Sequence, residues 1–289
     1  MKPPGPPVID LHTHSAYSDG TQAPADLVAE AHAAGLDVLG LTDHDTVAGW
    51  DEAATTATAL GITLVRGIEV STTHDQASVH LLGYLTDPAE PALEAELARA
   101  RHARDTRLIG MVELMAADGI PITFAEVVAQ VAPGATAGRP HIADALIANG
   151  TIAHRDEAFA DWLTDDSPYY VAHYAPDPLR AVELVRAAGG VPVLAHPFTR
   201  TRGPGVTDEL VEQLHAAGLA GLEAYHRDHG PEQVARCERL AARHGLLLTG
   251  SSDYHGTGKR NQLGENATTP EVLAAIEALS SGATPVLRP

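Results

Sequence analysis

The hydrophobic and polar positions of the chain repeat one unit four times. Each unit has an Ala-rich amphipathic stretch, a glycine, a short apolar run and then polar residues; the apolar runs are residues 37–41, 191–194, 219–222 and 246–248. Many helices end at a residue with a left-handed backbone conformation, which glycine adopts easily. Short continuous apolar runs are typical of parallel strands buried on both faces. The pattern therefore predicts an α/β fold in which helices and parallel strands alternate.

Two further strands are indicated nearer the start of the chain. Residues 8–14 alternate with a period of two, which places Asp10, His12 and His14 on one face and Ile9 and Leu11 on the other. A second apolar run, residues 62–68, ends in a glutamate. Parallel α/β barrels carry their active groups at the carboxyl ends of the strands. The sequence places these candidate side chains there: His44, Glu69, His196, His226, Asp253 and His255.

The repeating unit is interrupted between residues 86 and 173. A long charged helix is predicted over residues 93–117, followed by shorter helices over residues 124–131, 141–149 and 155–163. We therefore expect a barrel formed by residues 1–86 and 173–289, and an all-helical insertion, residues 87–172, that covers the barrel mouth as a lid. The arginines of the long helix are interpreted as a solvated face rather than as phosphate ligands: Arg99, Arg101, Arg104 and Arg107.

Composition excludes several classes of function. The 289 residues include 38 Asp and Glu against 19 Lys and Arg, a net charge of −19, which disfavours long duplex nucleic acid as a partner. The single cysteine, Cys237, excludes an internal disulfide and fits a reducing compartment. No segment has the apolar length to cross a bilayer, and the Pro-rich residues 1–7 lack the apolar stretch of a signal peptide. We expect a cytoplasmic protein without a membrane partner, and nothing indicates an obligate protein partner.

Histidine is abundant in this composition, with 16 residues, and this abundance favours metal chemistry. Nine His, Asp and Glu residues, most of them at or just beyond predicted strands, supply nitrogen and oxygen ligands without a thiolate. Such a set suits Zn, Mn or Fe rather than Cu(I) or an iron–sulfur cluster. The nine are His12, His14, Asp19, His44, Glu69, His80, His196, Asp253 and His255.

Eight of these residues, all except His80, lie in six short motifs. They are Asp-Leu-His-Thr-His-Ser at 10–15, Ser-Asp-Gly at 18–20, Leu-Thr-Asp-His-Asp at 41–45, Gly-Ile-Glu-Val-Ser at 67–71, Ala-His-Pro at 195–197 and Ser-Asp-Tyr-His-Gly at 252–256. In this order they resemble the polymerase and histidinol phosphatase (PHP) family of metal-dependent phosphoesterases. A Gly-Arg-Pro-His motif at 138–141 resembles the branch with 3′,5′-nucleoside bisphosphate phosphatases and 5′→3′ exonucleases. The resemblance implies a distorted (β/α)₇, TIM-like barrel with a helical insertion.

The resemblance also implies two to three divalent metal ions and their ligands. Glu69 would bridge the first and second ions, and His74, in a predicted hairpin turn, is an alternative to His80. The first ion would be held by His12, His14, Glu69 and Asp253, the second by Glu69, His80 and His196, and the third by Asp19, His44 and His255.

Such ions would provide the chemistry of phosphoester hydrolysis. Zinc lowers the pKa of bound water to about 7, and the cations neutralise charge on the phosphoryl and leaving oxygens. We therefore predict Glu69, Asp253 and His255 as catalytic residues. Asp43 or Asp45 would protonate the leaving group, although Asp45 is equally suited to capping the next helix.

Other polar residues are candidates for contacts around the ions. Arg139 is the first candidate for binding a phosphate, because its planar fork can hold two phosphate oxygens, and His141 and His226 follow. Lys259 would contact a second phosphate or cap a loop. Asp10 would orient one of the ligand imidazoles.

Three functions compete at this point. The first is a metal-dependent phosphatase for a nucleotide phosphomonoester, such as a 3′,5′-nucleoside bisphosphate. The second is a 5′→3′ exonuclease that acts on short RNA or DNA oligonucleotides, while a histidinol-phosphate phosphatase fits the insertion less well. The third is a metal-binding module without catalysis, which the complete set of nine ligands disfavours.

Overall fold

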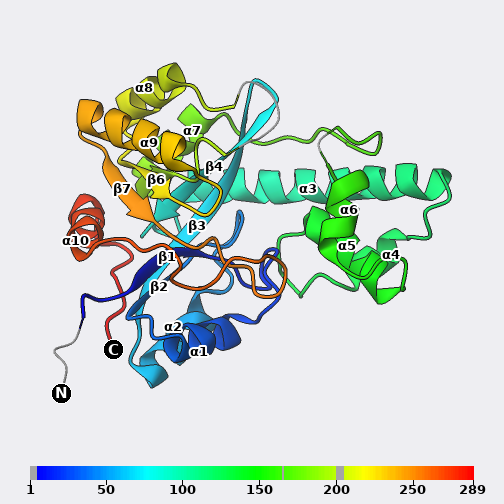
Figure 1. Ribbon diagram of the computed structural model, residues 1–289, viewed down its shortest axis with the longest axis horizontal. Helices are drawn as coiled ribbons and strands as arrows, with labels where there is room; N and C mark the ends of the chain where they lie inside the picture. Colours follow the sequence, from blue (N-terminus) through cyan, green and yellow to red (C-terminus); the bar gives the residue numbers. More distant parts are fainter. Residues whose placement is uncertain (1–4, 165, 200–204) are drawn as a thin grey trace.

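Among the residues that the structure describes, seven strands form one sheet whose order in space follows the sequence. The computed structural model describes residues 5–164, 166–199 and 205–289, so residues 1–4 of the proline-rich start lie outside the described part. A bridge between Thr13 and Tyr254 brings the first and last strands together and nearly closes the barrel (Figure 1). The strands are β1 (Ile9–Thr13), β2 (Val38–Leu41), β3 (Thr63–His74), β4 (Ala77–Tyr84), β5 (Val191–Leu194), β6 (Gly221–Tyr225) and β7 (Leu247–Gly250).

The barrel is distorted at β3 and β4, as the sequence motifs imply for the whole fold. Every neighbouring pair of strands is parallel except those that include β4, which runs antiparallel to both β3 and β5. A two-residue turn, Asp75 and Gln76, joins β3 to β4, and both residues have positive φ, 47° and 65°. Such a turn is typical of a β-hairpin. A hairpin therefore replaces one helical crossover, and β3 extends beyond the predicted run of residues 62–68.

Helices cover the outside of the barrel, as the repeating unit predicts. The glycines that end α2, α8 and α9 have the left-handed conformation, with φ of 75° at Gly61, 111° at Gly218 and 69° at Gly245. Absence of a Cβ makes this conformation accessible. These outer helices are α1 (Pro24–Ala33), α2 (Trp50–Leu60), α7 (Pro178–Ala187), α8 (Asp208–Ala217) and α9 (Pro231–His244).

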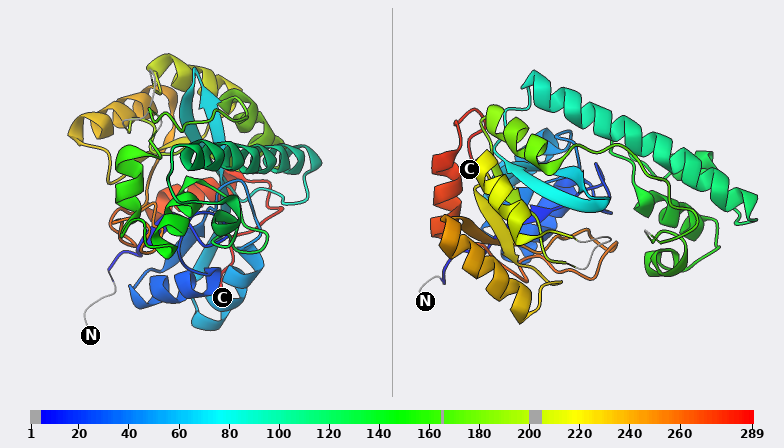
Figure 2. Two further views of the ribbon diagram at one scale, coloured as in Figure 1. Left: turned by 90° about the vertical axis from the view of Figure 1, so that its right-hand side faces the viewer. Right: turned by 90° about the horizontal axis from the view of Figure 1, so that it is seen from above.

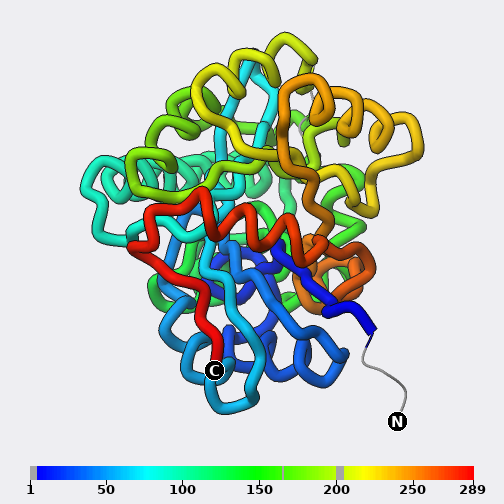
Figure 3. Tube along the Cα trace, turned by 90° about the vertical axis from the view of Figure 1, so that its left-hand side faces the viewer, coloured from blue at the N-terminus to red at the C-terminus, as the bar shows by residue number. Residues whose placement is uncertain are grey.

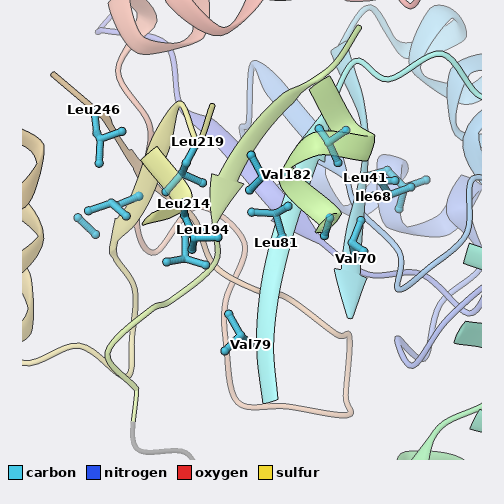
Figure 4. Packing of buried hydrophobic residues seen from close by; sticks show 14 of the residues in the cluster. Leu41, Ile68, Val70, Val79, Leu81, Val182, Leu194, Leu214, Leu219 and Leu246 are labelled. Carbon is cyan, nitrogen blue, oxygen red and sulfur yellow. The ribbon is translucent and has the colours of Figure 1, made fainter. Parts of the chain in front are cut away.

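The two faces of β2, β3, β4, β5 and β7 belong to different hydrophobic clusters. Outward side chains such as Leu81 and Leu194 pack against helix residues that include Val182 and Leu214 (Figure 4). Inward side chains fill the barrel on the other face: Ile9, Val65, Tyr84 and Val193. Helix α10 (Pro270–Leu279) adds Leu273 and Ile276 to this inner cluster and lies across one end of the barrel (Figure 3).

The helical insertion extends from the opposite end of the barrel (Figures 1 and 2). It contains α3 (Pro91–Ala117), α4 (Phe124–Val128), α5 (Arg139–Ala148) and α6 (Arg155–Asp161), within a few residues of the predicted helices. Leu93 and Leu97 of α3 belong to the barrel core, whereas Met111 and Met115 pack with α4, α5 and α6 in a separate cluster. One continuous helix therefore connects the two cores. No helix in the described part of the chain is long and apolar enough to span a membrane.

Candidate metal centre

The candidate ligands converge at the barrel end that faces the insertion. His12 and His14, at the end of β1, have their Nε2 atoms 3.0 Å apart. Oε2 of Glu69 lies 3.2 and 3.1 Å from these two nitrogens, and Oδ1 of Asp253 lies 3.5 and 3.4 Å from them. All four side chains are buried. Within the described part of the chain, they form one of three groups of His, Asp and Glu that could hold a metal ion.

The hydrogen bonds around this group show which atoms can bind a cation. His12 donates from Nδ1 to Glu223 Oε1 at 3.0 Å. His14 donates from Nδ1 to Ser18 Oγ at 3.3 Å, because the Ser18 hydroxyl already donates to Asp43. In neutral imidazoles with these donors, both Nε2 atoms carry lone pairs. Two lone pairs and two carboxylates then meet without a donor between them, so the group fits a divalent cation.

The charge of the site favours the same conclusion. Burial lowers the pKa of His12 and His14, but the carboxylates outweigh it, so the pKa of His12 is well above its usual value and that of His14 is about 9. Burial also raises the pKa of Glu69, yet His12, His80 and His44 hold it well below its usual value. A field that retains protons on buried imidazoles equally favours a metal cation.

A second group lies beside the first and shares His14. It adds Asp19, His44 and His255, the three residues predicted for a third ion. His255 donates from Nδ1 to the backbone carbonyl of Asp253 at 2.8 Å, which leaves the lone pair of Nε2 facing Asp19 Oδ1 at 3.1 Å. The lone pair of His255 Nε2 and the carboxylate oxygen of Asp19 thus face each other, an arrangement that suits a cation between them.

A third group consists of His44, Glu69 and His80, so it contains Glu69 and His80 of the predicted second ion together with His44. His80 Nδ1 lies 2.9 Å from Glu69 Oε1, and His196 Nε2 lies 3.3 Å from the same oxygen, so His196 is adjacent to the group. The alternative ligand, His74, is at the far end of β3, where its Nδ1 lies 3.5 Å from Asp177. The structure therefore favours His80 over His74.

Backbone geometry supports these positions. Asp45, His196 and Asp253 follow strands with φ of 54°, 29° and 53°, values that residues with a Cβ adopt at a cost in energy. In the Ser-Asp-Gly motif, a Cβ on Gly20 would lie 2.3 Å from the carbonyl oxygen of His14. Glycine is therefore required for the loop that carries Asp19 to pack against β1.

Two predicted roles are corrected by the contacts of the residues concerned. Asp43 accepts hydrogen bonds from the backbone N–H of Ser15 and from the hydroxyls of Ser15 and Ser18. It is buried and organises the loop after β1, so it is not placed as an acid for a leaving group. Asp45 accepts from the backbone N–H of Ser71 and from Arg104, so it neither protonates a leaving group nor caps α2.

The carboxylate that orients a candidate ligand is Glu223 rather than Asp10. Asp10 accepts from the backbone N–H groups of Ser252 and Gly264, and burial raises its pKa to about 6. Glu223, at 0% exposure in β6, binds Nδ1 of His12 and also accepts from the backbone N–H of His196 at 2.9 Å. Its position at the end of a predicted strand is the signal that could have identified it.

A cavity of about 250 Å³ opens above the second and third groups. Asp19, His44 and His80 lie on its barrel side. Helices and loops of the insertion provide the opposite wall, with Arg104 and Arg107 of α3, Arg139 of α5, and the rings of Phe159 and Tyr170. Arg104 also donates to Asp45, and Arg107 is only 7% exposed, so the interpretation of these arginines as a solvated face is wrong.

The other predicted contacts fall around this cavity. Lys259 lines it and places Nζ 2.6 Å from Asp253 Oδ2. His226 lines a neighbouring cavity of about 140 Å³ with His196 and Asp253, and its Nδ1 accepts from the backbone N–H of Asp228. His141 is buried beside the cavity, where its Nδ1 accepts from the backbone N–H of Gly138 at the start of α5.

Known proteins are similar to this chain in fold and in sequence. Residues 10–130 match the PHP domain family. A 3′,5′-nucleoside bisphosphate phosphatase of Chromobacterium violaceum is 34% identical over 93% of this chain and 94% of its own. A 5′-3′ exoribonuclease of Haemophilus influenzae is 32% identical over 89% of this chain and 93% of its own.

A solved structure agrees with the sequence relatives. A Bifidobacterium adolescentis protein assigned as a metal-dependent phosphoesterase has 41% identity and a TM-score of 0.92, over 96% of this chain and 98% of its own. The barrel, the insertion and the clustered candidate ligands, together with these relatives, thus identify the protein as a hydrolase that acts on phosphoesters. The chain belongs to the PHP domain family, as its motifs predict.

Proposed function

We propose that this phosphoesterase hydrolyses a phosphomonoester of a small nucleotide, such as a 3′,5′-nucleoside bisphosphate, to a nucleoside 5′-monophosphate and phosphate. One observation carries the proposal. The groups of His, Asp and Glu side chains that could hold metal ions lie directly beside a small cavity lined by arginines. Ligand cavities commonly measure about 300–1,000 Å³, so a cavity of about 250 Å³ suits a single nucleotide better than a polymer. The C. violaceum relative, a nucleoside bisphosphate phosphatase, supports the same substrate.

Two to three divalent ions, drawn from Mn, Zn and Fe, would occupy these groups. When bound, they would supply a water that is activated at neutral pH and would neutralise charge on the phosphoryl oxygens. Glu69 reaches the first and third groups, so it is the residue best placed to hold two ions together. The nine predicted ligands remain His12, His14, Asp19, His44, Glu69, His80, His196, Asp253 and His255.

The cationic wall would hold the part of the nucleotide that does not react. Arg139 donates from Nη1 to the carbonyl of Leu163 at 2.7 Å, which orients its guanidinium at the cavity wall. Arg107 is held against the ring of Tyr170, 5.1 Å from its centre. Guanidinium groups in fixed orientations are suited to bind a phosphate through two oxygens. A second phosphate of a nucleoside bisphosphate would therefore be bound at this wall.

Residues 87–172 would act as a lid over the metal groups. The lid supplies one wall of the cavity, while the barrel supplies the ligand groups, so the complete site exists only when both parts are in contact. Arg101 and Arg104 of α3 hold the two parts together by donating to the carbonyl and the carboxylate of Asp45, directly after His44. Contact between lid and barrel would also exclude water from the reaction.

Phosphate release tests this proposal. Purified protein loaded with Mn²⁺ is assayed against nucleoside monophosphates, 3′,5′-bisphosphates and histidinol phosphate, with a chelated sample as control. We expect the highest kcat/KM for a 3′,5′-bisphosphate. The proposal fails if no mononucleotide releases phosphate under conditions in which the protein binds Mn²⁺.

The alternative is stepwise 5′→3′ hydrolysis of short RNA or DNA. The H. influenzae exoribonuclease supports it, as does a neighbouring cavity of about 640 Å³ that shares Lys259 with the first and leaves room for more chain. That cavity includes Asp144, Asp156 and Glu157 among its lining residues, and these carboxylates disfavour a phosphodiester chain. Release of mononucleotides from a 5′-phosphorylated oligomer, at a rate above that for bisphosphates, would favour the exonuclease.

The compartment is part of the same proposal. Cys237 is a free, buried thiol whose pKa burial raises to about 12, so it is suited to packing rather than to disulfide exchange. We therefore place the protein in the reducing cytoplasm, with a small nucleotide as its partner.

A further inference from the structure

The first residue of α6, Arg155, contacts both parts of the protein. Its Nε and Nη2 atoms donate to the two carboxylate oxygens of Asp144 on α5, each at 2.6 Å. Its Nη1 atom crosses to the barrel and donates to the backbone carbonyl of Asp19 at 3.0 Å. The Arg155 side chain is 11% exposed, so this bidentate contact is largely shielded from solvent. One guanidinium thus joins the lid to the loop that carries a candidate metal ligand.

The same guanidinium packs on the second loop of that ligand group. A Cβ on Gly258 would lie 2.3 Å from Arg155 Nη1, so the absence of a side chain there makes room for the arginine. Gly258 donates its backbone N–H to the carbonyl of His255 at 3.2 Å. Arg155 therefore contacts the loop of Asp19 and the loop of His255, the two residues whose acceptors face each other at 3.1 Å.

A neighbouring ion pair provides a contrast. Arg260 and Asp156 also connect the His255 loop to α6, at 2.9 Å, but their side chains are 85% and 71% exposed. Exposed pairs contribute little because water and salt screen them. The contact of Arg155 is shielded, has three hydrogen bonds and reaches a ligand loop, so it can transmit a change of position between lid and barrel.

We propose that Arg155 is a positioning residue that couples contact between lid and barrel to metal binding by His14, Asp19, His44 and His255. The inference rests on the proposed function, since it requires an ion in that group. Coupling of this kind is reciprocal. The lid in its contact position fixes the Asp19 loop and raises metal affinity, and a bound ion fixes the loop and stabilises the lid. The enzyme would thus complete this ligand group when the cationic wall is in place.

Metal titration of the full-length protein tests the coupling. Mn²⁺ binding is measured by equilibrium dialysis for the wild type and for Arg155→Ala, Arg155→Lys and Arg260→Ala. Changing a residue that orients a metal ligand lowers affinity by about 10–100-fold, so we expect such a loss for one class of ion in Arg155→Ala. Lysine lacks the fork and should restore only part of the affinity, and Arg260→Ala should match the wild type.

A second variant and a second readout separate positioning from a general loss of structure. Gly258→Ala keeps Arg155 but displaces its guanidinium, so it should reproduce the same selective loss. Hydrogen exchange of α5 and α6 should slow when Mn²⁺ is added to the wild type but not to Arg155→Ala. Equal Mn²⁺ affinities and equal protection in the variants would overturn the coupling alone. Failure of the wild type to bind Mn²⁺ would overturn the proposed function and the coupling together.

Discussion

The two ends of the barrel interior are built on the same strands but differ in chemistry. Along β3, Val65 lies in the closed end and Glu69 in the open end; along β4, Tyr84 and His80 are divided in the same way. Helix α10 seals the closed end with apolar side chains, of which Ile276 is fully buried. The open end concentrates imidazoles and carboxylates instead. Four residues along a strand are enough to change from packing to ligand binding.

The contrast teaches that stability and function are divided along the barrel axis. Apolar burial at the closed end stabilises the folded state whether or not metal ions are bound. Buried acceptors at the open end cost folding free energy unless protons or metal ions compensate them. Substitutions at the two ends should therefore affect different measured quantities.

The largest effect is expected from Glu69→Gln at the open end. Glutamine has the shape of glutamate but lacks the charge that would hold two ions together. Since even residues that only orient ligands change activity by about 10–100-fold, we expect kcat/KM for phosphate release to fall more than about 100-fold, with circular dichroism unchanged. Unchanged turnover would contradict a mechanism that depends on this carboxylate, and would support a metal-binding module without catalysis.

The opposite behaviour is expected from Ile276→Ala at the closed end. Removing this buried side chain leaves a cavity and should lower the free energy of unfolding by about 2–5 kcal/mol, measured by urea denaturation. The kcat of the folded fraction should stay at the wild-type value. Leu279→Ala, at a side chain 47% exposed on the same helix, is the control and should change stability by about 0.5 kcal/mol or less. A loss of kcat in Ile276→Ala would show that the two ends are not independent.

A smaller effect at the open end is expected from Glu223→Gln. The amide nitrogen of glutamine cannot accept the hydrogen bond that the backbone N–H of His196 gives to Glu223. Metal affinity should fall by about 10–100-fold, as measured by calorimetric titration. Asp10→Asn is the matched control, because Asp10 binds backbone N–H groups of the closing loops. Equal losses of metal affinity in both variants would contradict the proposal that Glu223 orients a metal ligand.

The smallest effect is a pH dependence that metal should abolish. In the chelated protein the pKa of His14 is raised to about 9 from a usual 6.5. The stability from this raised pKa is fully present below about pH 6.5 and is lost as pH rises through 9. The Tm of the chelated protein should therefore decrease over this window, while a protein saturated with Mn²⁺ should show a flatter profile. The same slope with and without metal would contradict ion binding at His14.

The repeating unit predicted the barrel, and helix boundary and turn residues predicted the insertion helices, because both depend on local signals. Glycines after helices and short apolar runs are readable in sequence, and Gly218 and Gly245 end helices as expected. The hairpin turn near His74 was predicted, but the antiparallel pairing of β4 with β5 was not, because β5 follows only after the helical insertion. Parallel and antiparallel neighbours differ in pairing, which a single strand does not specify.

The site could be predicted where motifs carry it and not where distant segments meet. The side chains of His12, His14 and Asp253 meet as their motifs imply. The contacts of Asp43 with Ser15 and Ser18, and of Arg104 with Asp45, join residues 25 to 59 positions apart. Nothing in the local pattern distinguishes such an arginine from one on a solvated helix face.

The bridge between Thr13 and Tyr254 has a consequence for synthesis of the protein. His14 and Asp253 are separated by roughly 240 residues, and at about 5–20 residues per second a ribosome takes about 12–48 s to translate them. Helix α10 follows still later and seals the closed end. During this interval the nascent chain carries histidines that have not yet met their late carboxylate, so metal selection by the complete first group belongs to the final stage of folding.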